Sequence, residues 1–542
     1  MGTAMFFSFM GSLIICMALI PALSASAWRL QFIDLPRERH AHREPIAKVG
    51  GIAFALATFI AVLVWAPKDP LILTSLFGGA VIVAFGVWDD RTGLNHRMKF
   101  AGQVLAAAIV IGLAGVRLSS LPFVDDVLLP AWLAVPLTLI VIVGVTNAVN
   151  LSDGLDGLAG GLSLISFAGV AYLAYQANEP LLVLLMVSVL GGLLGFLRFN
   201  TYPARIFMGD AGSQFLGHYL AVAAILLTDA ARTAYSPLLA LFIWGIPLLD
   251  TAGVMGQRLW ERRSPFVGDR NHVHHKLLAI GFTHGQAVTL IYVVHGVMVS
   301  CAYLLRWQSD VVLAGVYLLF AAGVFGLFAR LPQTAGVGPV DTTPARQDGR
   351  RLPAIHGALT EWPLTLLYLA IPVYLVVSIA IPREIPSDAG LIAGGLAIAV
   401  LGSLILQRAT SWVVRAALYV GSTCLMYYGE VFPRSAVTDL LTPVNVGVAG
   451  LAVLVFLTIR FAGEDRFQTT PLDYLIVLLA GAMPFLPEMT VGTVPVGLLA
   501  AKLIVLFFAF ELLLHMRSTA VIRLGLVSLV SLGGVLLRAW WP

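Results

Sequence analysis

The sequence predicts an all-α polytopic membrane protein, and composition and patterning both point to it. Of its 542 residues 59% are hydrophobic and only 11% are charged, and long apolar runs recur along the chain. An average soluble domain is roughly 25% charged, whereas a membrane-spanning helix needs about 20 apolar residues in sequence. The runs are continuous rather than alternating, which argues against an outer-membrane barrel. Water-soluble folds, coiled coils, collagen and disordered chains are excluded.

The first part of the chain is predicted to form a core of about eleven helices, each ending at charged or Gly/Pro-rich residues. The first run lacks a basic segment before it and is too long for a signal sequence, so we expect a retained helix. The predicted ranges are 4–28, 49–66, 71–88, 100–116, 131–149, 161–176, 181–197, 214–229, 235–256, 286–305 and 310–329.

About seven additional helices are predicted after a polar stretch. Their ranges are 363–382, 388–407, 411–429, 444–460, 471–487, 494–515 and 520–539. The organisation is therefore a membrane domain at 1–330, a cytoplasmic linker at 331–361 and an additional transmembrane module of unknown function at 362–542. Lys502 and Glu511 lie in one apolar run of this module, where they are expected either to have a function or to form an interhelix ion pair or reach the membrane interface.

The basic residues predict the orientation in the membrane. With the N-terminus outside, most of the 33 Lys and Arg residues fall in cytoplasmic loops. The formal charge of +4 then reflects topology, and we expect no nucleic-acid partner. The polar loops at 29–48, 88–99, 147–160, 198–213 and 257–285 all fall on this cytoplasmic side. This distribution is typical of an enzyme that joins a soluble substrate to a lipid.

Two adjacent carboxylates, Asp89 and Asp90, begin the second of these loops, and Lys99 follows them. Neighbouring carboxylates repel each other, so they are expected where a cation binds or where one of them is protonated. A solvated turn at the end of a helix is the alternative.

Polar residues recur at every third position of the third loop: Asn147, Asn150, Asp153 and Asp156. A 3₁₀ or unwound helix end would align them on one side. Carboxylate and amide oxygens are suited to Mg²⁺, and the interleaved glycines permit close approach of a ligand. A plain glycine-rich helix terminus is the alternative.

Two further loops carry candidate phosphate-binding residues. Asp210 and Ser213 precede an apolar run, so we expect them at a helix start, where N–H groups attract anions and a carboxylate can cap. Arg270, His272, His274 and His275 are donors matched to a diphosphate that gains charge in a transition state. Metal binding or a structural role remains an alternative for the histidines.

Together these segments resemble the signature set of the polyprenyl-phosphate N-acetylhexosamine-1-phosphate transferases of glycosyltransferase family 4. The similarity covers about residues 1–330, with the motifs in family order. The His-x-His-His form after Ser-Pro-Phe resembles the branch that uses undecaprenyl phosphate and GlcNAc more than the MurNAc-pentapeptide branch. The resemblance implies transfer of an N-acetylhexosamine 1-phosphate, most simply GlcNAc 1-phosphate, from a UDP-N-acetylhexosamine to undecaprenyl phosphate in a bacterial inner membrane, with Mg²⁺ or in its place Mn²⁺.

The resemblance also implies roles for the residues. Asp210 and Asn150 are expected to bind the metal, and Asp89, Asp90 and Lys99 to orient or deprotonate the lipid phosphate. The expected substrate-binding residues are Asn147, Asp153, Asp156, Ser213, Arg270, His272, His274 and His275.

Two other classes of membrane protein are alternatives to the transferase. An intramembrane prenyltransferase would carry repeated Asp-x-x-Asp motifs, and a lipid or sugar transporter would bury polar residues near the membrane midplane. Release of UMP from a UDP-sugar distinguishes the transferase from both. The oligomeric state is left open, with a homodimer as one arrangement.

Overall fold

A computed structural model describes residues 2–34, 45–124, 128–264, 271–330, 353–407, 410–433, 438–461, 490–491, 494–517 and 519–541. The chain divides into two compact units, Met1–Asp341 and Thr342–Pro542. Eleven of the described helices are long and apolar enough to cross a membrane. The prediction of an all-α, multi-pass membrane protein is therefore confirmed.

The first unit contains the predicted helices and one more. The additional helix is α10, seven residues that lie inside the predicted histidine loop and include His274 and His275. The bounds are α1 (Gly2–Leu30), α2 (Gly50–Trp65), α3 (Pro70–Thr92), α4 (His96–Ala114), α5 (Ala131–Leu151), α6 (Leu158–Gln176), α7 (Pro180–Asn200), α8 (Gly209–Leu227), α9 (Leu239–Trp260), α10 (Val273–Ala279), α11 (His284–Leu304) and α12 (Asp310–Arg330).

The second unit contains α13 (Pro353–Ser378), α14 (Ser387–Leu406), α15 (Thr410–Val431), α16 (Thr438–Phe461), α18 (Val496–Met516) and α19 (Ala520–Trp540), with a short hairpin of β3 (Thr490–Val491) and β4 (Val494–Pro495). The predicted helix at 471–487 lies outside the described residues. Helix α13 begins at Pro353, inside the stretch that the sequence predicted as linker, and a proline is favoured at the first position of a helix because its missing N–H needs no partner there.

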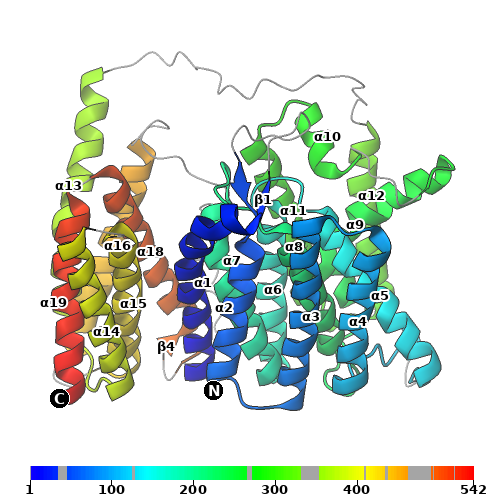
Figure 1. Ribbon diagram of the computed structural model, residues 1–542, viewed down its shortest axis with the longest axis horizontal. Coiled ribbons are helices and arrows are strands. Elements are labelled where there is room, and N and C mark those ends of the chain that lie inside the picture. Colours follow the sequence, from blue (N-terminus) through cyan, green and yellow to red (C-terminus); the bar gives the residue numbers. More distant parts are fainter. Residues whose placement is uncertain are drawn as a thin grey trace. The chain divides into compact units, whose positions relative to one another are not determined.

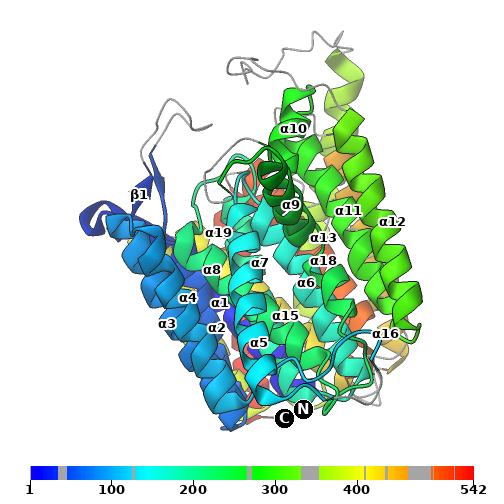
Figure 2. The same ribbon diagram turned by 90° about the vertical axis from the view of Figure 1, so that its right-hand side faces the viewer.

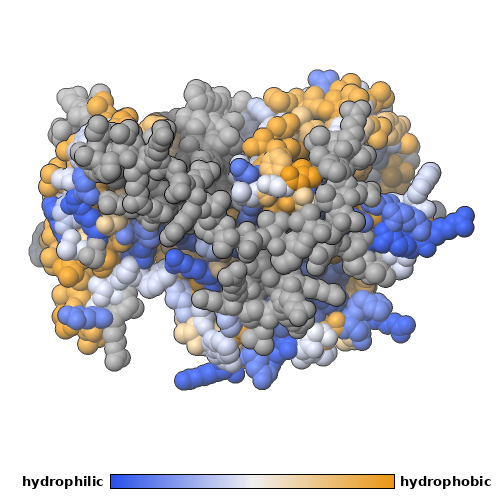
Figure 3. Space-filling view, turned by 90° about the horizontal axis from the view of Figure 1, so that it is seen from above, coloured by the Kyte–Doolittle hydropathy of each residue, from blue (hydrophilic) through white to orange (hydrophobic). Residues whose placement is uncertain are grey.

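Successive long helices of the first unit run in opposite directions. The ends of α3, α5, α7 and α9 and the starts of α4, α6, α8 and α11 therefore meet at one end of the bundle, where α10 and the hairpin of β1 (Ile33–Asp34) and β2 (Ile46–Ala47) also lie (Figures 1 and 2). Seen from above, hydrophilic side chains project beside hydrophobic ones (Figure 3). The polar segments singled out in the sequence are thus neighbours in space.

Helix α8 is the central helix of the first unit. Every residue from Ala211 to Leu227 is buried, and the helix packs against α2, α3, α5 and α6. A helix that is apolar on all sides is typical of such a central position. Since Asp210 is at the start of α8, the site is attached to the most enclosed element of the unit.

Helix α9 is broken at Gly245, whose φ of 42° and ψ of −126° are not helical. Pro247 follows and has no N–H to donate to Ile243. Ser166 donates to the carbonyl of Ile243 at 2.7 Å instead, and the Ile246 N–H donates to Nδ1 of His295 at 3.3 Å. Side chains from α6 and α11 therefore replace the lost helical bonds and hold the bend.

Ion pairs join the helices of the second unit. Lys502 of α18 lies 2.5 Å from Glu430 of α15 and 2.6 Å from the amide oxygen of Asn445. Glu511 pairs with Arg415 at 2.9 Å. The ion-pair alternative for Lys502 and Glu511 is therefore the one that the structure shows.

Candidate active site

Asp89 and Asp90 occupy the last turn of α3. The apolar run predicts that the helix ends at residue 88, and this boundary is wrong because the helix continues to Thr92. Consecutive helical residues are rotated by about 100° around the axis, so the two carboxylates point in different directions. They therefore have separate partners, which relieves the repulsion expected of an adjacent pair.

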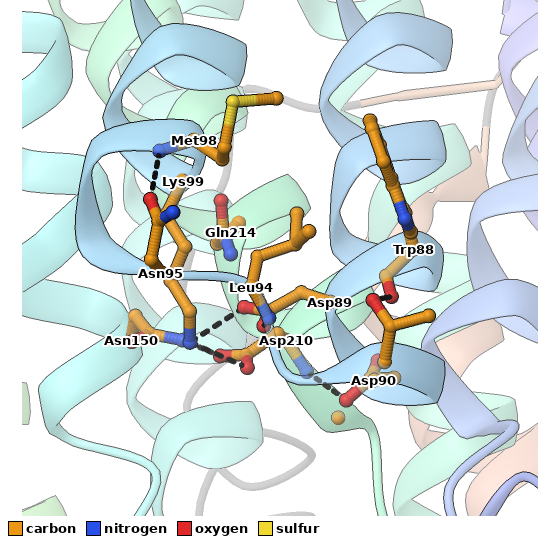
Figure 4. A network of polar contacts seen from close by, with 12 residues as sticks. Trp88, Asp89, Asp90, Leu94, Asn95, Met98, Lys99, Asn150, Asp210 and Gln214 are labelled. Carbon is orange, nitrogen blue, oxygen red and sulfur yellow. Dashed lines mark hydrogen bonds and ion pairs between the residues drawn. The ribbon is translucent and has the colours of Figure 1, made fainter.

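Asp89 is 4% exposed and is held by two donors. Its Oδ1 accepts from the Leu94 N–H at 2.7 Å, and its Oδ2 lies 2.5 Å from Nζ of Lys99, in the first turn of α4. The Lys99 ammonium also donates to Oδ2 of Asp210 at 3.2 Å. Figure 4 shows Lys99 reaching both carboxylates. The predicted Asp89, Lys99 and Asp210 thus form one cluster.

Asp90 points to the start of α8. Its two carboxylate oxygens accept from the N–H groups of Asp210 and Ala211, at 2.9 and 3.0 Å. We expected these N–H groups to attract a phosphate, but a protein carboxylate already binds them. The diphosphate would then have to be held by other donors.

Asp210 is joined to the end of α5 through Asn150. The Asn150 amide nitrogen lies 2.7 Å from Oδ1 of Asp210 and 2.7 Å from Oγ of Ser213. Helix α5 continues to Leu151, so the expected 3₁₀ or unwound segment does not occur at Asn147 and Asn150. Asn150 instead projects from the last helical turn toward the start of α8.

A buried amide cluster lies about one helical turn before Asn150 in α5. Asn147 donates to Oε1 of Gln103 at 2.7 Å and to the carbonyl of Val143 at 2.8 Å. Gln103 also donates to Gln214 at 3.3 Å, and both glutamines are at most 3% exposed. The sequence analysis assigned no role to Gln103 or Gln214, because single amides in apolar runs form no motif. The cluster links α4, α5 and α8 next to Asp210.

Asp153 and Asp156 lie in the connection between α5 and α6. Asp156 accepts from the Ala204 N–H at 2.9 Å and so binds this connection to the segment after α7. The Asp153 side chain remains exposed. The pKa of Asp153 is nevertheless raised, to about 7, because neighbouring protein displaces part of the water around the carboxyl group and because Asp210 and Asp156 add negative potential. Asp153 therefore faces the same cluster of acidic groups.

His272 is oriented by Asp250, a residue of α9 that the sequence analysis missed. Nδ1 of His272 donates to Oδ2 of Asp250 at 2.7 Å, and the Val273 N–H donates to Oδ1 at 2.9 Å. Both side chains are less than a tenth exposed. A carboxylate inside an apolar, membrane-spanning run costs free energy, so such a residue is expected to have a function. This property of Asp250 is the signal by which the sequence could have identified it. Asp250 thus fixes both the imidazole and the start of α10.

His274 lies beside the α5–α6 connection. A Cβ at Gly154 would come within 2.2 Å of its Nε2, so the backbone passes directly against the imidazole. Within the described part of the chain this buried Nε2 has no hydrogen-bond partner. Burial, followed by the neighbouring His275, lowers the pKa of His274 to about 3. The imidazole of His274 is therefore neutral near pH 7, and its Nε2 is left to bind another group.

The geometry brings most of the predicted residues to one end of the first unit. The centre of this site is formed by Asp89, Lys99, Asp210 and Asn150. The charge of Asp210 acts on Asp153, and Gly154 lies directly against His274. His272 and His274 have nearly parallel rings whose centroids are 5.8 Å apart, and the ring of His275 is tilted by 47° against that of His274 at 4.3 Å. Arg270 lies outside the described residues.

Comparison with known proteins agrees with this arrangement. The sequence profile of glycosyl transferase family 4 matches residues 72–228. A probable undecaprenyl-phosphate N-acetylglucosaminyl 1-phosphate transferase of Bacillus subtilis (strain 168) is 32% identical over 321 residues, which cover 59% of this chain and 89% of the relative.

Two further relatives have related names. The decaprenyl-phosphate N-acetylglucosaminephosphotransferase of Mycobacterium leprae is 35% identical over 308 residues, covering 50% of this chain and 76% of the relative. The undecaprenyl-phosphate alpha-N-acetylglucosaminyl 1-phosphate transferase of Salmonella typhi is 32% identical over 277 residues, covering 49% and 74%.

The multi-pass helical fold and relatives that are named as transferases identify this protein as a membrane transferase. The chain belongs to glycosyl transferase family 4, as its similarity along most of the Bacillus relative shows.

Proposed function

We propose that this protein transfers N-acetylglucosamine 1-phosphate from UDP-N-acetylglucosamine to undecaprenyl phosphate. The products are the undecaprenyl-diphospho-sugar and UMP. The observation that carries the proposal is the cluster of Asp89, Lys99, Asn150 and Asp210 beside His274, in a chain whose relatives are named for this transfer. The excess of basic residues in the adjoining loops supports a cytoplasmic site in a bacterial inner membrane.

In the proposed reaction an oxygen of the lipid phosphate attacks the β-phosphorus of the UDP-sugar. The new bond joins this oxygen to phosphorus, the bond from the β-phosphorus to the bridging oxygen breaks, and UMP leaves with that oxygen. The nucleophile is already anionic, so catalysis consists mainly of alignment and of compensating negative charge. Lys99 attracts the lipid phosphate, and the imidazoles of His274 and His275 donate hydrogen bonds to the diphosphate. His272, whose Nδ1 proton is bound by Asp250, presents Nε2 as an acceptor for a substrate N–H or O–H group.

The residues present fit a Mg²⁺ ion. Asp210 supplies a carboxylate, and Mg²⁺ usually takes one or two protein carboxylates and completes its shell with water and phosphate oxygens. Asn150 turns its NH₂ group toward Asp210 and Ser213, so it would hold the metal through its amide oxygen only after the amide turns over. Among the described residues no group of three His, Cys, Asp or Glu side chains is arranged to hold a metal by itself. When bound, Mg²⁺ would neutralise charge on the diphosphate.

The test is release of UMP by the purified full-length protein given undecaprenyl phosphate and a panel of UDP-sugars. We expect turnover with UDP-N-acetylglucosamine, loss of turnover in EDTA and recovery with Mg²⁺ or Mn²⁺. Asp210→Asn should reduce turnover by about 100-fold or more. Asp229→Asn is the control, because Asp229 binds Ser119 beyond the opposite end of α8. Absence of UMP with every sugar, or undiminished turnover in Asp210→Asn, would contradict the proposal.

A further inference from the structure

Asp90 occupies the N-terminus of the helix that carries Asp210. Both of its carboxylate oxygens accept backbone N–H groups of the first turn of α8, from Asp210 and Ala211. Figure 4 shows Asp90 next to Asp210. These groups have no partner within the helix itself, and the positive end of the helix dipole favours an anion there. A carboxylate of α3 therefore caps α8 across the packing interface.

The backbone at the start of α8 is shaped around this carboxylate. Gly209 has a φ of +67°, a conformation that favours glycine, and a Cβ there would lie 2.4 Å from Oδ2 of Asp90. One turn earlier in α3, a Cβ at Gly86 would lie 2.4 Å from Cα of Ala211. Helices α3 and α8 thus meet backbone to backbone beside the cap. Asp90 has little freedom to turn toward a substrate without leaving the two N–H groups.

We propose that Asp90 is a positioning residue: it caps α8 and thereby aims Asp210 at Asn150 and Lys99, and it does not act on the lipid phosphate. The adjacent carboxylates then divide two tasks. Asp89 faces the Lys99 ammonium and remains in the charged cluster, whereas Asp90 holds the backbone from which Asp210 projects. The consequence for Asp210 rests on the proposed function, but the cap itself does not.

The first measurement is hydrogen exchange of the full-length protein in lipid nanodiscs. Asp90→Asn keeps the shape and one acceptor oxygen, so we expect a folded variant in which the N–H groups of Asp210 and Ala211 exchange about ten-fold faster, as for loss of a helix cap. Asp69→Asn is the matched control, because Asp69 caps the start of α3 through the Leu71 N–H at 2.8 Å, at the other end of the bundle. In Asp69→Asn the faster exchange should be confined to α3.

The second measurement is Mn²⁺ binding, followed by electron paramagnetic resonance, together with turnover. An Asp210 that is no longer held in position should weaken Mn²⁺ binding and raise the Mg²⁺ concentration for half-maximal turnover. Gly209→Ala, which leaves every ionisable group in place, should have the same effects because its Cβ displaces Asp90. Asp69→Asn should bind Mn²⁺ as the wild type does.

The opposite pattern would overturn the inference. If Asp90→Asn leaves exchange at Asp210 and Ala211 and Mn²⁺ affinity unchanged but removes a limb of the pH profile, then Asp90 acts on a substrate proton. Unchanged exchange in both Asp90→Asn and Gly209→Ala would also reject it. Exchange and Mn²⁺ binding need no substrate, so a failure of the proposed sugar transfer would leave these results interpretable.

Discussion

The ammonium of Lys99 lies between two carboxylates, 2.5 Å from Oδ2 of Asp89 and 3.2 Å from Oδ2 of Asp210. One positive charge therefore faces two negative charges, and the exposed Asp153 lies in the same field. The imbalance leaves room for a further cation, as proposed for Mg²⁺. It also makes Lys99 necessary for the burial of Asp89.

Removal of Lys99 should affect stability and turnover separately. Lys99→Met leaves the buried Asp89 without its cation and should lower the free energy of unfolding by about 1–3 kcal/mol, a range reduced because Lys99 itself is partly exposed. Asp89→Asn/Lys99→Met should restore the thermal unfolding temperature but not UMP release. Lys68→Met, in the exposed loop before α3, is the control. Full turnover in the double variant would assign the pair a purely structural role.

Asp250→Asn should impair turnover by changing the tautomer of His272. The asparagine oxygen can still accept from the Val273 N–H, but its NH₂ group would face Nδ1 of His272, so the ring proton must move to Nε2. We expect kcat/KM for the UDP-sugar to fall by about 10- to 100-fold, as for other residues that orient a functional histidine. The folded protein should otherwise be intact.

Asp310→Asn is a suitable comparison for this variant. Asp310 also accepts two hydrogen bonds, from the Phe123 N–H and from Ser236, but it lies at the start of α12, at the opposite end of the bundle. The kcat/KM of Asp310→Asn should equal that of the wild type. Equal kinetics for Asp250→Asn and Asp310→Asn would show that the orientation of His272 does not matter.

The pH dependence of stability should contain two opposed contributions, from His274 and Asp153. The folded pKa of His274 is lowered to about 3 from 6.5 by burial, so below pH 6.5 the unfolded chain binds a proton that the folded protein does not. The free energy of unfolding therefore falls with acidification, by up to about 1.4 kcal/mol per pH unit. His274→Asn should lose this acid sensitivity.

Asp153 acts in the other direction. Its folded pKa is raised to about 7 from 3.8, so between these values the folded protein binds a proton that the unfolded chain does not, and stability rises as the pH falls. Asp153→Asn should therefore exceed the wild type in unfolding temperature most clearly at pH 8 and least at pH 5. Unfolding temperatures measured without divalent cations test both residues, and parallel profiles for all three proteins would contradict the assignments.

The second unit should depend on its ion pairs, whereas turnover should not. Glu430→Gln leaves the Lys502 ammonium, which is 6% exposed, with only the Asn445 oxygen, and should destabilise this unit by about 3–5 kcal/mol. Glu430→Gln/Lys502→Met should regain stability. UMP release should be unchanged in the double variant, because every proposed site residue belongs to the first unit. A stable double variant with low turnover would instead show that the second unit takes part.

The helices could be predicted from apolar runs, but their ends could not. Helix α3 passes Asp89 and Asp90, and α5 passes Asn150, because partners on other helices satisfy those polar side chains. A hydropathy profile assigns such polar residues to loops. The short helix α10 was missed for a similar reason, since its first N–H is bound by Asp250, more than twenty positions earlier.

What the sequence determined by itself was the class of protein, the set of acidic, amide and histidine residues, and their common side of the membrane, because hydropathy, charge and residue type are properties of the linear chain. Only the tertiary structure decided which group faces which. Asp90 binds the backbone of α8, Lys99 joins Asp89 to Asp210, and Asp250 holds His272. These pairs form where separate helices pack, and a hydrogen bond depends on distance and direction that spacing along the chain does not encode.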